Sequence, residues 1–199
     1  MEVSFFKGGV SIPRPIVSFL VKSLVAFVLW KVLYLFLLQP ARVPDRQLTR
    51  FIGNATAWTL NGFGTAHSYK AVEVSDVDVE DNVAHPTTAM DLQRDGLQTL
   101  RVADACNGLE LMVLYIGFIV CFPAPLSRKL SFGFAGCLMI VLLNILRCAA
   151  LVQIFLKYRA YLDFSHHFAF TFVIYGLIFL LWYLFSKNLS LQHDRKAKA

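Results

Sequence analysis

Charged residues are scarce in this chain. They make up 16% of its 199 residues, whereas about 25% is usual for a soluble globular domain. Hydrophobic residues account for 57% of the chain, and the mean hydropathy is +0.57. This composition is too apolar for an ordinary water-soluble domain and is typical of membrane proteins.

The cysteines lack the spacing of metal sites and of disulfide frameworks. None of the four belongs to a CxxC motif or to a Cys/His ligand pattern: Cys106, Cys121, Cys137 and Cys148. We therefore expect no metal and no cofactor. The net charge of +6 is not gathered into one basic face, so nucleic acid is not an expected partner. Lys and Arg instead flank apolar runs, where they orient a chain in the bilayer.

Four apolar runs predict an all-α polytopic membrane protein with about four transmembrane helices. The runs cover residues 16–38, 109–122 (extendable to 105), 130–156 and 168–185. The first is long enough to span the bilayer, so an uncleaved helix is favoured over the rival interpretation, a cleaved signal peptide. Lys31 lies inside this run and must reach the membrane surface or face a partner helix.

The polar block at 39–105 predicts a small mixed α/β insertion between the first and second spans. Residues 49–60 place Phe51, Ile52, Ala55 and Trp58 at helical spacing, which predicts an amphipathic helix at the membrane interface with Trp58 as its anchor. Residues 69–79 alternate as a strand with a bulge or turn at 75–76, and 98–103 predict another strand. Residues 80–90, around His85 and Pro86, predict a turn.

The basic residues of the short loops predict the orientation. With four spans, the N-terminal flank, the turn at 128–129 and the C-terminal tail fall on one side, which we expect to be the cytoplasm. The insertion is then extracytoplasmic, and the protein is placed in the inner (cytoplasmic) membrane. The expected regions are the flank and first helix (1–38), the insertion (39–105), a three-helix catalytic membrane core (106–186) and a basic cytoplasmic tail (187–199).

In this topology a cysteine, an arginine and a histidine pair reach one membrane depth. Cys106 opens the second run on the outer side, and His166 with His167 opens the fourth. Arg147 lies 17 residues after Leu130, which is about 26 Å of helical rise and brings it near the outer face of a ~30 Å core. Polar groups in such segments are costly and tend to be functional.

These residue types favour nucleophilic catalysis. A cysteine near a helix N-terminus and near cations is activated as a thiolate, and a histidine can take its proton and return it to a leaving amine. Arg147 is permanently charged, so it suits an oxyanion or a substrate carboxylate. Supporting roles are expected for the nearby polar residues Asn107, Glu110 and Asn144.

Each candidate also has a structural interpretation. Cys106 could be a small filler, Arg147 a structural partner of Glu110, and the histidines helix-start residues. Cys148 is adjacent to Arg147 but about 100° away around the helix, so it is the weaker candidate nucleophile.

The ordered motifs resemble the exosortase/archaeosortase family of membrane-embedded cysteine transpeptidases. They are Ala105-Cys106-Asn107-Gly108, then Asn144-Ile145-Leu146-Arg147, then His166 or His167. The resemblance implies that Cys106 is the nucleophile, Arg147 the catalytic arginine and one histidine, with His166 slightly favoured, the third member. It also implies substrates: exported proteins whose C-terminal signal comprises a short motif, a transmembrane helix and a basic cluster. Cleavage would proceed through an acyl-thioester, with transfer to a lipid or surface acceptor.

Four spans are fewer than in many members of that family, so the chain resembles a short form. A second copy in a homodimer, or an accessory membrane protein, could supply missing helices, and strands of the insertion could pair with an extended substrate segment. The alternative hypothesis is a non-catalytic membrane assembly or scaffold protein with a structural Arg147–Glu110 pair. A thiol redox or acyl-carrier enzyme is a weaker hypothesis. Its resolving cysteine would have to be Cys148, which lies inside a predicted span.

Overall fold

The computed structural model describes residues 3–4, 11–12, 14–41, 43–62, 68–80 and 83–197. The N-terminal part contains β1 (Val3–Ser4), β2 (Ser11–Ile12), α1 (Arg14–Leu33), the π-helix η1 (Tyr34–Leu38) and α2 (Gln39–Ala41). The insertion contains α3 (Asp45–Gly62), β3 (Tyr69–Glu80), β4 (Val83–Arg94), β5 (Leu97–Ala103) and the 3₁₀ turn η2 (Asp104–Cys106). The rest comprises α4 (Leu109–Cys121), α5 (Leu126–Lys157), η3 (Arg159–Tyr161), α6 (Leu162–Phe164), η4 (Ser165–Ala169) and α7 (Phe170–Ala197).

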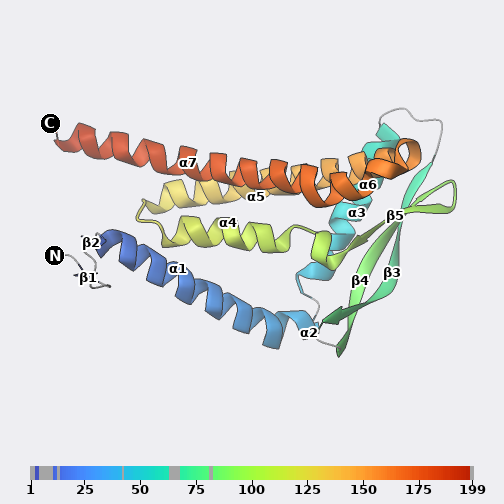
Figure 1. Ribbon diagram of the computed structural model, residues 1–199, viewed down its shortest axis with the longest axis horizontal. Coiled ribbons are helices and arrows are strands. Elements are labelled where there is room, and N and C mark those ends of the chain that lie inside the picture. The colour runs from blue at the N-terminus through green and yellow to red at the C-terminus, as the bar shows by residue number, and fades with distance from the viewer. Residues whose placement is uncertain are drawn as a thin grey trace.

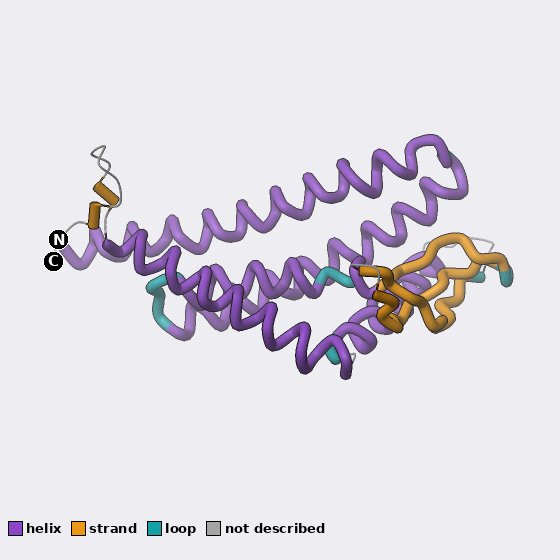
Figure 2. The backbone as a smooth tube through the Cα atoms, turned by 60° about the horizontal axis from the view of Figure 1, so that its bottom comes forward, coloured by secondary structure: helices purple, strands orange, loops and turns teal. Residues whose placement is uncertain are grey.

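The helices α1, α4, α5 and α7 run alongside one another, with both chain ends at one end of the bundle (Figure 1). The helix α3 and the three-stranded sheet lie at the opposite end, as Figure 2 also shows. Among the described residues, three helices are long and apolar enough to cross a membrane: Val17–Leu38, Leu126–Lys157 and Phe170–Lys187. The expected second span, α4, has only 13 residues and is about 20 Å long, shorter than a ~30 Å core.

Large apolar side chains fill the centre of the bundle. Tyr115 of α4 is fully buried there with Ile140 of α5 and Ile178 of α7. The Tyr115 hydroxyl donates a hydrogen bond to the carbonyl of Phe132 (2.8 Å). A Cβ at Gly136 would overlap the Tyr115 ring, so this glycine allows α4 and α5 to pack closely.

The basic residues expected in a turn before the third span lie in the first turn of α5 instead. Arg128 donates to the carbonyl of Phe185 (2.9 Å), and Lys129 donates to the carbonyl of Val120 (2.8 Å). Lys129 therefore bonds a carbonyl in the last turn of α4, where carbonyls without a helical partner accept cations readily, whereas Arg128 bonds a carbonyl within α7.

The sheet is antiparallel with strand order β3-β4-β5. The expected strand at 98–103 is confirmed as β5. The predicted turn at 80–90 is wrong, because 83–90 belong to β4, and the β3–β4 register runs without a break past Ser75 and Asp76. The irregularity falls between Leu92 and Gln93 instead. The turn was predicted because of Pro86, which is unusual in a strand. Pro86 lies where β4 pairs with β3 alone, and a strand with one neighbour tolerates proline.

The helix α3 packs between the sheet and the end of α5. Ile52 of α3, Leu92 of β4 and Val152 of α5 are all fully buried in one cluster. Of the face predicted to enter the membrane interface, Ile52 is buried in this cluster, whereas Phe51 and Trp58 are exposed. The insertion therefore stacks on the end of the bundle and positions the chain between β5 and α4.

Candidate active site

Cys106 lies on the turn that joins the sheet to the bundle. The strand β5 ends at Ala103, η2 carries Cys106, and Gly108 follows with φ of 83° before α4 begins. L-residues with side chains rarely adopt this left-handed conformation, and glycine does so without strain. Gly108 therefore lets the chain leave the turn and enter α4.

Asn107 fixes the start of α4. Its side chain is 2% exposed, and its Oδ1 accepts a hydrogen bond from the Leu109 backbone N–H (2.8 Å). Its Nδ2 donates to Asp45 Oδ1 (3.0 Å) and to Thr49 Oγ1 (3.3 Å). The residue after the cysteine is thereby tied both to α4 and to α3.

Two buried polar residues of α3 hold the turn from the side of the insertion. The Thr49 hydroxyl donates to Asp104 Oδ1 (2.5 Å), and Asp45 Oδ2 accepts from the Tyr34 hydroxyl (3.0 Å). Neither Asp45 nor Thr49 was a candidate from the sequence. Their spacing of four residues places them on one helix face, and polar residues along such a face were the available signal.

Asn144 links Cys106 to α5. Its Nδ2 donates to the Cys106 carbonyl (2.9 Å), and the residue is 1% exposed. Arg147 follows three residues later, about 4.5 Å further along the axis. Cys106 and Arg147 therefore lie at a similar level along α5, at the end of the bundle that carries the insertion.

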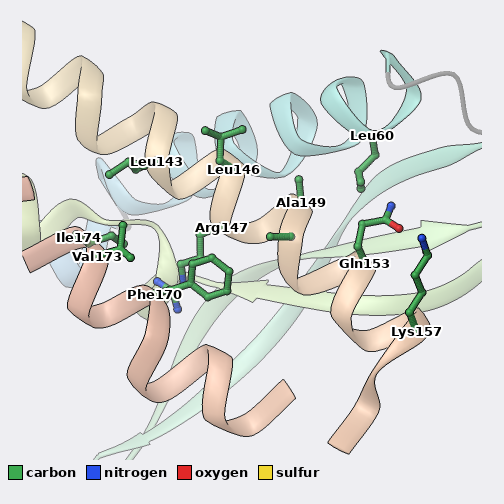
Figure 3. A pocket seen from close by; sticks show the side chains of 11 residues that line it. Leu60, Leu143, Leu146, Arg147, Ala149, Gln153, Lys157, Phe170, Val173 and Ile174 are labelled. Atoms are coloured by element: carbon green, nitrogen blue, oxygen red, sulfur yellow. The ribbon is translucent and has the colours of Figure 1, made fainter. Parts of the chain in front are cut away.

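Arg147 lines a pocket of about 650 Å³ between α5 and α7. Its side chain extends from α5 toward Phe170, the first residue of α7 (Figure 3). Gln153 and Lys157 are the other polar residues of the lining, and the rest is apolar. The pocket thus combines an apolar wall with two cationic side chains of α5, those of Arg147 and Lys157.

The remaining candidates occupy varied positions. The backbone of His166 and His167 forms part of η4, directly before α7, and their side chains lie outside the described residues. Glu110 is exposed and pairs with Lys31 of α1 (3.3 Å), so Lys31 faces a partner helix. Cys148 is 3% exposed and belongs to the apolar cluster beneath α3, as expected of a filler.

A family model described as transmembrane exosortase matches residues 16–185. The match extends beyond the three motifs to the first helix and the insertion. Searches of curated proteins and of solved structures found no match. Since the family match covers most of the chain and the apolar helices are those of a membrane protein, the chain belongs to the transmembrane exosortase family.

Proposed function

We propose that this protein is a membrane cysteine transpeptidase that cleaves the C-terminal sorting signal of exported proteins and transfers them to an acceptor. The observation that carries the proposal is the hydrogen bond from Asn144 to the Cys106 carbonyl (2.9 Å). It attaches the backbone of a partly buried cysteine without a disulfide to α5 at a residue three positions before Arg147. Membership of the exosortase family supports the same reaction class.

The reaction has two acyl-transfer steps. The Cys106 sulfur, after giving its proton to a histidine, bonds to the carbonyl carbon of the scissile peptide, and the carbonyl oxygen takes the negative charge. The C–N bond then breaks, the leaving nitrogen takes the proton from the histidine, and an acyl-thioester remains on Cys106. An acceptor amine, hydroxyl or water attacks the thioester, loses its proton to the histidine, and releases the sulfur. We assign the proton transfers to His166 or His167.

Arg147 is proposed to stabilise the oxyanion. Its guanidinium keeps its charge at any physiological pH and is a strong donor to anionic oxygens. It faces a pocket whose walls are mostly apolar, and electrostatic stabilisation is stronger where water is scarce. Asn144 does not add a donor to this site, because its Nδ2 bonds the Cys106 carbonyl; its buried Oδ1, which has no hydrogen-bond partner among the described residues, is an acceptor.

The pocket between α5 and α7 is the proposed entry for the substrate's apolar segment. Its lining includes Leu146, Val173 and Phe170, which suit the transmembrane helix of a sorting signal. We place the site on the extracytoplasmic side of the cytoplasmic membrane, with both termini in the cytoplasm. A homodimer or an accessory membrane protein would complete the substrate groove.

Replacing Cys106 tests the proposal. In the native host, Cys106→Ala and Cys106→Ser are expected to abolish removal of C-terminal tails from exported proteins, scored by C-terminal peptide mass spectrometry. Cys121→Ala is the matched control, since Cys121 ends α4 at the opposite end of that helix, and it should leave tail removal intact. Normal processing in both Cys106 variants would refute the proposal.

The scaffold alternative differs in what it expects of Arg147. That hypothesis expected a structural pair between Arg147 and Glu110, and the ion pair described for Glu110 is with Lys31. We expect Arg147→Lys to lower tail removal at least tenfold with normal protein abundance, because lysine keeps the charge but loses the planar donor fork. A scaffold that needs only the charge would tolerate this change.

A further inference from the structure

The polar residues on the buried face of α3 are unusual for a helix packed against a sheet and a bundle. Thr49 is 0% exposed and Asp45 is 6% exposed. Buried polar groups are costly unless they are hydrogen-bonded. The side chains of both residues form hydrogen bonds with residues outside α3. Thr49 bonds Asp104 and Asn107, and Asp45 bonds Asn107 and Tyr34.

These bonds converge on the residues around the cysteine. Asp104 precedes Cys106 by two positions and Asn107 follows it directly. On the opposite side, Asn144 holds the Cys106 carbonyl itself. The backbone of the turn is thus restrained from α3 and from α5 at three neighbouring residues, while Cys106 remains partly exposed.

We infer that Asp45 and Thr49 are positioning residues, which hold the Asp104–Gly108 turn so that the Cys106 sulfur keeps a fixed place relative to Arg147. The inference rests on the proposed function and extends it, because it makes α3 of the extracytoplasmic insertion part of the catalytic apparatus. Neither residue touches the reacting atoms in this role. Small displacements of a reacting group can cost about 100-fold in rate, so a loose turn would impair catalysis in a folded protein.

Thr49→Val is the principal test, because valine has nearly the shape of threonine but neither donates to Asp104 nor accepts from Asn107. Thr49→Ser keeps the hydroxyl and should rescue the function. Thr56→Val is the matched control on the same helix: Thr56 is also 0% exposed, but its hydroxyl donates to the Ile52 carbonyl within α3 (2.7 Å). Asp45→Ala, which removes the acceptor of Asn107, provides a second variant should Thr49→Val fail to fold.

The first readout is backbone hydrogen exchange of the purified full-length chain. The Leu109 amide reports the network directly, because it donates to Asn107 Oδ1. We expect exchange in the 104–109 segment to rise about tenfold in Thr49→Val, consistent with the loss of a buried hydrogen bond, and to stay unchanged in Thr49→Ser and Thr56→Val. Unchanged exchange in both Thr49→Val and Asp45→Ala would overturn the inference.

The second readout is tail removal from the host's exported proteins at matched enzyme abundance. Thr49→Val is expected to slow it about tenfold or more, with Thr49→Ser and Thr56→Val close to the wild type. Normal tail removal in Thr49→Val, with none in Cys106→Ala, would overturn the positioning role and leave the proposed function standing. Normal tail removal in Cys106→Ala would overturn the proposed function and the inference that rests on it.

Discussion

Two glycines of α5 differ sharply in how much space the neighbouring helices leave for a side chain. A Cβ at Gly136 would overlap the buried Tyr115 ring, whereas a Cβ at Gly133 meets nothing within 4 Å. Of these two glycines, only Gly136 is in close contact with a side chain of a neighbouring helix. Sequence gives the residue type but not which helix face a neighbour will cover.

Gly136→Ala is therefore expected to destabilise the protein. Overpacking of a filled core costs about 1–3 kcal/mol, and the Tyr115 hydroxyl would also lose its bond to the Phe132 carbonyl. Gly133→Ala should be neutral or stabilising by up to about 1 kcal/mol, because alanine is the better helix former. Thermal unfolding in detergent compares the two variants, and equal stabilities would contradict the described packing of α4 on α5.

The sequence could identify only those candidate site residues whose type is unusual for their surroundings in the chain. Cys106 and Arg147 stood out because they are polar residues in or beside apolar runs, and helical rise alone placed them at one depth. Asp45 and Thr49 did not stand out, because they lie in a polar block where such residues are ordinary. The positioning role that we infer for them rests on contacts with Asp104 and Asn107, more than fifty positions away in the sequence.

At the scale of elements, charged side chains on the surface join α3 to the sheet. Glu73 of β3 accepts hydrogen bonds from Arg50 (2.7 Å to its Nε) and from Arg46 (2.8 Å). These hydrogen bonds lower the pKa of the Glu73 carboxyl below its usual value, and the bond from Arg50 has the largest effect. The pairing therefore favours the ionised, folded form.

The sign of the lowered Glu73 pKa sets a pH dependence. A carboxyl whose pKa is lower in the folded state stabilises the fold above its unfolded pKa, about 4.3 for glutamate, and loses this effect as pH falls through the folded value. We expect Glu73→Gln to lower the melting temperature slightly at pH 7, since exposed pairs contribute little. The difference should vanish well below pH 4 and shrink in high salt. A difference that persists in acid would show that another contact is responsible.

Elements with strong periodicity were predicted well and those with mixed signals were not. The long apolar runs became α1, α5 and α7, and the alternating residues became β3. The strand β4 was not predicted because it contains Pro86. This proline is tolerated because it lies beyond the end of β5, and the local sequence does not reveal how strands pair. The length of α4 was overestimated, because the apolar run alone does not show that the Cys106 turn extends to Gly108.

At the scale of the whole molecule, the insertion and the bundle meet where the candidate site lies. The sheet and α3 cover the end of the bundle opposite to the chain ends (Figure 1), and α4 is shorter than its neighbours. The Cys106 turn thus lies between the insertion and the membrane-spanning helices. Under the proposed function, a nucleophile at this junction would meet the substrate where its sorting motif joins its transmembrane helix.

Intact-mass analysis of the enzyme isolated from its native host tests the central claim most directly, since it asks whether an acyl group is carried on Cys106. We predict that part of the wild-type chain bears an added acyl mass, that peptide mapping places it on Cys106, and that hydroxylamine removes it, as expected of a thioester. Cys106→Ala should carry none. An adduct that persists in Cys106→Ala, or one that maps to Cys148, would contradict the account.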